Sequence, residues 1–329
     1  MSESNQLSDL ALLRVENLVK HYPVAVRSFS RSTGRVYAVD GVTFSIQRGE
    51  AFGLVGESGC GKSTLCRAVA GLESEVQGVV YLEGRNLLNL RGKERKAIAR
   101  EVQMIFQDPK ASLHPLMRIE EALMEPFAIH NLGQPAERSK MVEELLERVG
   151  LRPEHKHRLP RGLSGGQRQL VCIARAIALK PKLILCDEPV SSLDVSMQSQ
   201  VLNLLQDLQE DLGLSYLFVS HNLGIVDYLC KTISVMYLGK IVEIAPNRDL
   251  VKRPLHPYTQ ALLSSIPSIS KGRKSQTRPP QGEIPSADKP PSGCRFHPRC
   301  LYAMERCQRE PPSLLTIETH RQVACHLYP

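Results

Sequence analysis

Two kinds of apolar pattern follow each other along the first 265 residues. Compact or alternating apolar runs are typical of strands, and they occupy residues 11–20, 36–46, 51–55, 183–186 and 214–220. Apolar residues at helical spacing indicate helices over 62–70, 165–179 and 201–212, and residues 93–149 are mostly helical in pattern. Because strands alternate with helices, the pattern predicts an α/β fold whose parallel sheet carries helices on both faces.

The residues after 250 have a different character. They hold 12 of the 22 prolines and 12 basic against 5 acidic residues, in a chain whose net charge is +8. We therefore expect a main domain over 1–265 with a helical subdomain at about 95–175, a Pro-rich linker at 266–292 and a small cysteine-rich domain at 293–329. The basic charge favours an anionic partner, although a solvated surface has the same composition.

The composition is that of an ordinary globular protein. Apolar residues make up 42% and charged residues 23% of the 329 residues, which excludes a fully disordered chain, a collagen and a small disulfide scaffold. No run approaches the ~18–20 apolar residues of a membrane span, and the polar first residues lack a signal-peptide core. These features predict a soluble, cytoplasmic protein whose nine cysteines are reduced, buried or metal-bound.

A glycine-rich turn between residues 51–55 and 62–70 fits the P-loop pattern G-x4-G-K-S/T. The backbone N–H groups of such a loop surround a β-phosphate, and the following helix adds positive potential. Lys62 is expected to reach the β- and γ-phosphates, and Ser63 to bind Mg²⁺. The alternative is a chance turn, against which the flanking strand and helix argue. The predicted binding residues are Gly56, Glu57, Ser58, Gly59, Cys60, Gly61, Lys62, Ser63 and Thr64.

Two acidic residues follow the apolar run at 183–186. Ligands of α/β sheets bind beyond the carboxyl ends of the strands, so we expect Asp187 near the metal and Glu188 near the γ-phosphate. Alone, this pair could be a solvated strand end. Together with the P-loop, it predicts an ATP site.

Five further motifs resemble those of ABC-type ATPases in their order and spacing. Leu-Ser-Gly-Gly-Gln at 163–167 resembles the signature sequence, with Ser164, Gly165, Gly166 and Gln167 as its binding residues. Gln107 resembles the Q-loop glutamine, Ser192-Leu193-Asp194 the D-loop, His221 the switch histidine and Tyr22 the aromatic on which adenine stacks. The resemblance covers about residues 11–265 and implies a P-loop NTPase fold with a RecA-like core and a helical subdomain. Asn222 departs from the family pattern, in which Asp commonly follows the histidine.

The resemblance also implies how these residues act. Two ATPase subunits face each other head to tail, so that Gly56–Thr64 of one and Ser164–Gln167 of the other hold the same ATP. Glu188 would polarise the attacking water, His221 would hold the γ-phosphate, and Gln107 would touch Mg²⁺ or water and report to a membrane partner. The predicted Mg²⁺ ligands are Ser63, Gln107 and Asp187.

Three stretches narrow the resemblance to the oligopeptide/dipeptide branch of ABC importers, and to its F-type ATPase subunit. They are residues 235–240, residues 255–262 and the cysteine-bearing C-terminal segment. The branch implies a second ATPase subunit, a paralogue of this chain, as partner, together with two transmembrane permeases and an extracytoplasmic solute-binding protein. It places the chain at the cytoplasmic face of the membrane. Nickel and other small solutes are imported by similar ATPases and remain alternatives.

Four cysteines cluster near the C-terminus, at Cys294, Cys300, Cys307 and Cys325. Four thiolates can complete a metal site, and about 40 residues rarely fold without a metal or disulfides. Free buried cysteines are one alternative, and zinc, with His297, His320 or His326 as further ligands, is another. The resemblance implies a [4Fe–4S] cluster held by the four cysteines, with a structural role.

Two other classes of function fit parts of the sequence. The basic C-terminal segment would suit a soluble ABC ATPase that acts on nucleic acid or ribosomes, but one compact cassette without large insertions argues against that class, and no nucleic-acid partner is expected. The other is a nucleotide-binding regulator without catalysis. Intact Lys62, Glu188 and His221 argue against it.

Overall fold

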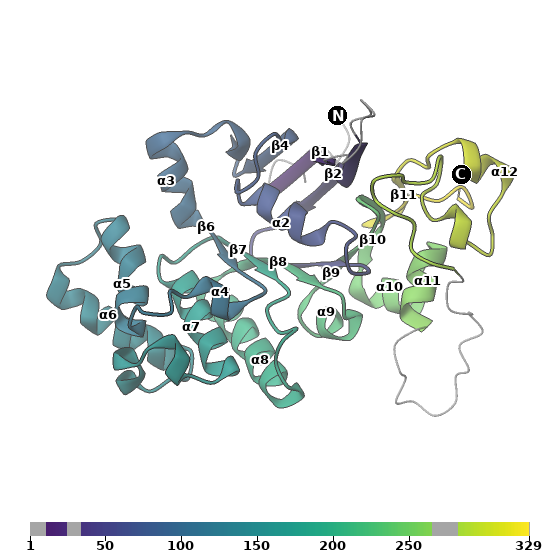
Figure 1. The fold of residues 1–329 in the computed structure, drawn as a ribbon. Helices are drawn as coiled ribbons and strands as arrows, with labels where there is room; N and C mark the ends of the chain where they lie inside the picture. The colour runs from purple at the N-terminus through teal and green to yellow at the C-terminus, as the bar shows by residue number, and fades with distance from the viewer. Residues whose placement is uncertain (1–10, 25–33, 265–281, 329) are drawn as a thin grey trace. The chain divides into compact units, whose positions relative to one another are not determined.

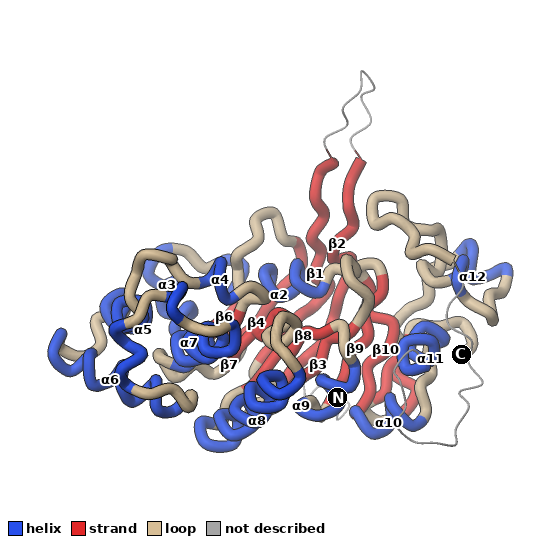
Figure 2. Tube along the Cα trace, turned by 60° about the horizontal axis from the view of Figure 1, so that its bottom comes forward, coloured by secondary structure: helices blue, strands red, loops and turns tan. Residues whose placement is uncertain are grey.

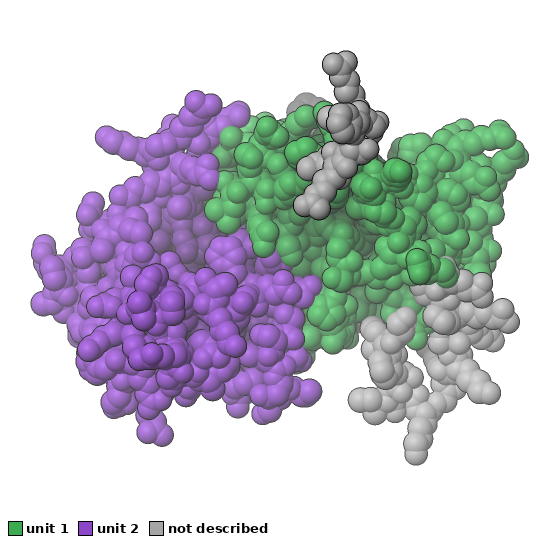
Figure 3. Space-filling view, in the orientation of Figure 1, with its two compact units in different colours: residues 1–46, 51–88, 219–329 green, residues 47–50, 89–218 purple. Residues whose placement is uncertain are grey.

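The computed structural model describes residues 11–24, 34–264 and 282–328. The chain divides into two compact units (Figure 3). The first comprises residues 1–46, 51–88 and 219–329, and the second residues 47–50 and 89–218. Within the described residues, none of the helices has the length and apolar character needed to cross a membrane.

Strands dominate the first unit (Figure 1). Its strands are β1 (Leu13–Val24), β2 (Gly34–Ile46), β3 (Ala51–Val55), β4 (Gln77–Leu82), β5 (Arg85–Asn86), β9 (Thr232–Tyr237), β10 (Lys240–Pro246), β11 (Leu315–Glu318) and β12 (Arg321–Val323). Its helices are α2 (Lys62–Val69), α9 (Leu223–Leu229), α10 (Asn247–Lys252), α11 (Pro257–Ser264), α12 (Glu305–Arg309) and the 3-10 turns Leu87–Asn89 and His297–Arg299.

These strands form two groups. The order β2-β1-β4-β5 is an antiparallel sheet, in which β1 and β2 run side by side as a long pair (Figure 2). In the other group β3 pairs with β9 in parallel, and β10, β12 and β11 extend it with antiparallel pairs. A parallel pairing, as the sequence predicted for the sheet, therefore joins β3 to β9, a strand that the sequence analysis did not identify. The sequence pattern did not reveal the antiparallel extensions.

The C-terminal residues join the first unit through main-chain pairing. β12 aligns Val323 with Glu243 of β10, and the hairpin partner β11 follows. Within residues 293–328, β11 and β12 thus extend the sheet that contains β10. Of the predicted linker at 266–292, residues up to 281 lie outside the described part of the chain.

Helices dominate the second unit. They are α3 (Gly92–Glu101), α4 (Pro109–Ser112), α5 (Ile119–Ile129), α6 (Pro135–Arg148), α7 (Gly165–Ile177) and α8 (Val195–Leu212), with 3-10 turns at Pro153–His157 and Pro160–Gly162. Its strands are β6 (Val102–Ile105), β7 (Leu183–Asp187) and β8 (Ser215–Ser220). The last two residues of β8, Val219 and Ser220, belong to the first unit.

β6 and β7 pair in parallel, and β8 lies on the other side of β7. Every residue of β7 and of β8 is buried, which is why both strands are continuous apolar runs instead of alternating ones. The sequence pattern did not predict β6, because this strand has only four residues and directly follows α3.

Candidate functional site

The glycine-rich turn leaves β3 after Val55 and enters α2 at Lys62. All five residues of β3 are buried, so the start of the turn is fixed to the sheet. No side chain caps the N-terminus of α2. The first N–H groups of a helix have no carbonyl one turn earlier to bind, and this is the arrangement in which a helix N-terminus receives an anion.

Two glycines of the turn are required by close approach of the backbone. A Cβ at Gly56 would lie 2.2 Å from the carbonyl oxygen of Met236, and one at Gly61 would lie 1.9 Å from that of Ala38. Gly61 also has φ of 108°, a value that L-residues rarely adopt. The tight course of the turn therefore depends on residues from β2 and β9.

Lys62 is folded back over the turn. Its side chain donates from Nζ to the carbonyl oxygens of Gly56 at 2.8 Å and Glu57 at 3.0 Å, and the residue is 4% exposed. Cys60 is buried beside it, and burial raises the pKa of its thiol although the Lys62 charge acts in the opposite direction. The ammonium group is thus held inside the phosphate-binding turn.

Tyr22 lies near the end of β1 and is half-buried. The Nζ atom of Lys20 lies 4.7 Å from the centre of its ring, and Lys20 also donates to the carbonyl oxygen of Ser74. Burial raises the pKa of Tyr22, whose hydroxyl is hydrogen-bonded to Thr64, a predicted loop residue. The predicted aromatic therefore lies next to the start of α2.

In the second unit, Gln107 and Glu188 meet. Gln107 follows β6, Glu188 follows β7, and Nε2 of Gln107 donates to Oε2 of Glu188 at 3.3 Å. Asp187, the last residue of β7, is 1% exposed. The parallel pairing of β6 and β7 brings their carboxyl ends to one edge.

The Leu-Ser-Gly-Gly-Gln turn forms a capping box at the start of α7. The Ser164 hydroxyl accepts from the N–H of Gln167 at 3.1 Å, and Oε1 of Gln167 accepts from the N–H of Ser164 at 3.0 Å. Ser164 and Gly165 are exposed, while a Cβ at Gly166 would lie 2.6 Å from Met197. The box leaves the start of α7 facing outward.

Two other predicted motifs also begin helices. Asp194 accepts from the N–H of Met197 at 2.9 Å and caps α8, and Asn222 accepts from the N–H of Gly224 at 2.9 Å and caps α9. His221 is exposed just before Asn222. Asn in place of the family's Asp thus keeps the capping function, since both residues are good N-caps.

The predicted ATP-site residues fall in both units. The loop Gly56–Thr64, Tyr22 and His221 belong to the first, and Gln107, Asp187, Glu188 and Ser164–Gln167 to the second. Within the first unit Tyr22 and the loop come together, and within the second Gln107 and Glu188 do.

Two residues that the sequence analysis did not select hold the loop in place. Glu57 donates its N–H to the hydroxyl of Tyr258 at 2.9 Å, and its carboxylate binds Arg299 at 2.9 and 3.1 Å. Tyr258 lies in the 255–262 stretch and Arg299 directly precedes Cys300, but no spacing rule links either to a loop about 200 residues earlier.

The four C-terminal cysteines line one small pocket, together with His256, Phe296, His297 and His326. Burial raises the pKa of Cys294 to about 11, against a hydrogen bond from the N–H of Phe296, and the other three cysteines raise it further. Burial likewise raises the pKa of Cys300 and Cys325. In the described part of the chain, no group of three or more His, Cys, Asp or Glu residues is arranged so that it could hold a metal ion.

Comparisons with known proteins agree with this geometry. The ABC transporter family matches residues 39–191, and the family "Oligopeptide/dipeptide transporter, C-terminal region" matches residues 242–307. The chain is 46% identical to the oligopeptide transport ATP-binding protein AppF of Bacillus subtilis, over 100% of both chains. It is 44% identical to the di/tripeptide transport ATP-binding protein DppF of Pseudomonas aeruginosa, over 96% of this chain and 97% of that one.

Among solved structures, the chain resembles the dimeric ATP-binding cassette MJ0796 in a post-hydrolysis state bound to ADP and phosphate. The TM-score is 0.63 and the identity 28%, over 72% of this chain and 99% of that one. The protein is therefore an ATP-hydrolysing member of the ABC transporter family, and it belongs to the branch of oligopeptide and dipeptide transport ATP-binding proteins.

Proposed function

We propose that this chain energises the import of dipeptides or oligopeptides through a membrane complex. The observation that carries this proposal is the match to peptide-transport ATP-binding proteins over the whole chain, including the C-terminal region. Its partners in the complex are a second ATPase subunit, two transmembrane permeases and an extracytoplasmic solute-binding protein. The chain then lies at the cytoplasmic face of the membrane, attached through the permeases.

The P-loop side of the ATP site comes from the first unit. Nucleotide phosphates would exchange for the loop carbonyls that Lys62 now contacts, and the uncapped N-terminus of α2 would add its N–H groups. Ser63 follows Lys62 and would bind Mg²⁺ through its hydroxyl. Tyr22, beside Thr64, supplies a ring for the adenine.

The water-activating side comes from the second unit. Glu188 polarises the attacking water, and its contact with Gln107 orients the carboxylate until Mg²⁺ and nucleotide are bound. Asp187 supplies a buried carboxylate for the Mg²⁺ shell. His221 holds the γ-phosphate. Catalysis of this kind is mainly positioning and charge neutralisation.

The exposed capping box at Ser164 supports a site shared between subunits. An outward-facing helix N-terminus can contact the γ-phosphate of a nucleotide held by another chain. Two chains arranged head to tail would then form two ATP sites, each with the P-loop of one subunit and the Ser164–Gln167 turn of the other. ATP would hold the two subunits together, and hydrolysis would release them.

For the four-cysteine pocket we propose a structural [4Fe–4S] cluster. The donors are of the right kind, because four thiols line one pocket and N–H groups of Phe296, Tyr302 and Leu327 point at three of the sulfurs. The four thiols are not arranged as a metal site in the described residues, so a cluster would have to draw them together. When bound, the cluster would supply a cross-link within residues 294–325. Iron and acid-labile sulfide in anaerobically purified protein, lost in Cys300→Ser but not in Cys230→Ser, would support it; zinc or no metal would refute it.

Peptide uptake tests the transport proposal. Cells that lack this chain should fail to take up radiolabelled di- and oligopeptides, and the wild-type gene should restore uptake while Lys62→Ala should not. Lys93→Ala, at an exposed position of α3, is the matched control and should restore uptake. Unchanged peptide uptake in cells without the chain would contradict the proposal.

A further inference from the structure

A buried arginine of the C-terminal segment forms an ion pair with a residue of the P-loop. In Arg299, Nη1 and Nη2 donate to the two carboxylate oxygens of Glu57 at 2.9 and 3.1 Å. Glu57 is the second residue of the glycine-rich turn, and 242 positions separate the partners. A forked contact of this kind is both strong and directional.

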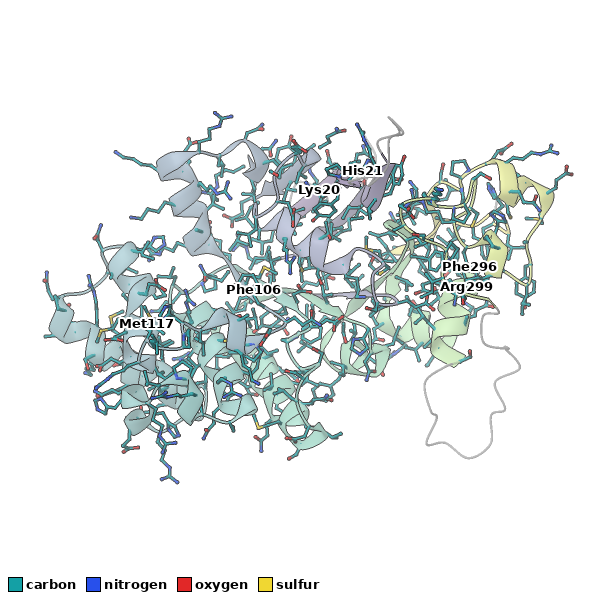
Figure 4. The ribbon with its side chains drawn as sticks, in the orientation of Figure 1. Lys20, His21, Phe106, Met117, Phe296 and Arg299 are labelled. Atoms are coloured by element: carbon teal, nitrogen blue, oxygen red, sulfur yellow. The ribbon has the colours of Figure 1, made fainter. Side chains whose placement is uncertain are left out.

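The guanidinium group is enclosed on its other sides. Its Cζ atom lies 5.9 Å from the ring centre of Tyr237 and 6.0 Å from that of Phe296, and Figure 4 shows Phe296 and Arg299 close to each other in this segment. The Arg299 side chain is 6% exposed, against 25% for Glu57. Burial alone would lower the pKa of Arg299, but the bonds to Glu57 and Tyr237 outweigh it and raise the pKa. The arginine therefore carries a full positive charge in a buried position.

Glu57 is fixed at its main chain as well. Its N–H donates to the Tyr258 hydroxyl at 2.9 Å, and its carbonyl oxygen accepts from Nζ of Lys62 at 3.0 Å. The residue that Arg299 holds by its carboxylate is thus the residue that positions the Lys62 ammonium group. A continuous chain of contacts runs from Arg299 through Glu57 to Lys62.

The charges explain why such a contact belongs at this place. The P-loop receives a triphosphate, and a carboxylate within the loop would repel it. Arg299 compensates the charge of that carboxylate, and the fork holds both of its oxygens. Lysine could supply the charge but not the fork.

We propose that Arg299 is a positioning residue of the ATP site, which neutralises Glu57 and holds the P-loop in its nucleotide-binding conformation. The C-terminal segment is then part of the ATP-binding apparatus and not an appendage to it. This inference rests on the proposed use of Gly56–Thr64 as the phosphate-binding loop.

The test measures binding of the fluorescent analogue mant-ATP with Mg²⁺ to the full-length chain. Arg299→Ala should raise the dissociation constant at least about tenfold at low salt. Added salt should reduce the difference, because it screens the uncompensated and partly exposed carboxylate of Glu57. Arg299→Lys should fall between wild type and Arg299→Ala. Arg309→Ala, in the same segment but 74% exposed and paired only with Glu305 among the contacts described, should bind like wild type.

A double variant separates charge compensation from a purely structural role. Glu57→Gln removes the carboxylate, so the Arg299→Ala/Glu57→Gln protein should bind mant-ATP several-fold more tightly than Arg299→Ala alone. Two results would overturn the proposal: wild-type affinity in Arg299→Ala, or no recovery in the double variant. Thermal melting of each variant shows whether the fold is retained, and the recovery is read only against variants that melt as one folded species.

Lys62→Ala distinguishes this inference from the assignment of the loop itself. If Lys62→Ala binds mant-ATP as wild type does, the loop is not the nucleotide site and the proposed function fails. If Lys62→Ala abolishes binding while Arg299→Ala leaves it unchanged, the loop assignment stands and only the role of Arg299 is wrong.

Discussion

Single side chains at the ends of strands carry the proposed chemistry. Glu188 follows a fully buried strand, so its backbone position is fixed, and its carboxylate already accepts a hydrogen bond from Gln107. Glu188 also has φ of 47°, a conformation that costs a non-glycine residue of order 1–3 kcal/mol. Strain of this size lowers the stability of the fold, and it fits a residue whose carboxylate is positioned for catalysis.

Glu188→Gln should retain ATP binding and lose hydrolysis. The amide keeps the shape of the side chain but cannot polarise water, so turnover should fall by about 10²–10⁴-fold. Phosphate release and mant-ATP binding measure the two properties separately. Glu210→Gln, an exposed carboxylate on α8, is the matched control. Near-wild-type turnover of Glu188→Gln would show that another group activates the water.

Asp40 on β2 should make stability sensitive to acid. Burial acts to raise its pKa, but Lys240, Arg295 and His21 outweigh burial and lower it. Because the folded-state pKa is depressed, the stabilisation is present above the unfolded value near 4 and is lost as pH falls through the folded-state pKa.

Asp40→Asn should therefore cost about 1–3 kcal/mol at pH 7 and much less at pH 2–3. Urea unfolding at both pH values measures the difference. Asp207→Asn, at an exposed position of α8, should change neither. A cost that is equal at both pH values would mean that the charge of Asp40 does not contribute.

At the scale of elements, the β10–β12 pair anchors the C-terminal hairpin. Arg321 of β12 and Glu243 of β10 are 1% and 0% exposed, with 3.8 Å between their charged groups. Glu243 also accepts from the N–H groups of Leu255 and His256 at 2.9 Å, and Arg321 donates to the carbonyl oxygen of Arg253 at 2.7 Å. This network joins β12 to the turn before α11, which carries Tyr258.

Arg321→Ala should lower the free energy of unfolding by about 3–5 kcal/mol, because it leaves a buried carboxylate without its charged partner. Arg306→Ala removes an exposed i,i+4 pair with Glu310 and should cost less than about 1 kcal/mol. Chemical denaturation of the full-length chain compares the two. Equal costs would indicate that the buried network does not stabilise the hairpin.

At the scale of the whole molecule, the residues predicted to bind ATP fall in both units, and we propose that two subunits share each nucleotide. The exposed Ser164 turn belongs to the second unit, and the P-loop to the first. A defect in the turn should then affect the nucleotide held by the facing subunit.

Ser164→Arg should leave mant-ATP binding by the isolated chain within about twofold of wild type. It should reduce ATP hydrolysis by the assembled complex at least about tenfold, because a bulky cation at the helix N-terminus disrupts the γ-phosphate contact. Equilibrium titration and phosphate release measure these effects. If binding by the isolated chain fell in parallel with hydrolysis, the turn would act within its own subunit.

The sequence alone determined the local parts of this protein. The P-loop pattern, the Leu-Ser-Gly-Gly-Gln motif and the apolar strands β3, β7 and β8 each depend on residues a few positions apart, so composition and spacing reveal them. The order of these motifs also identified the family. Boundaries shifted by a few residues, and β6 was missed, because short strands carry little periodic signal.

Tertiary structure alone decided which distant residues meet. Arg299 binds Glu57 across 242 positions, β12 pairs with β10, and Asp40 contacts His21 of β1, Lys240 of β10 and Arg295 of the C-terminal segment. No periodicity encodes such contacts, because they depend on how separate elements pack. The physical reason is burial. A charged group removed from water needs an oppositely charged partner at bonding distance, and only the assembled fold brings the two together.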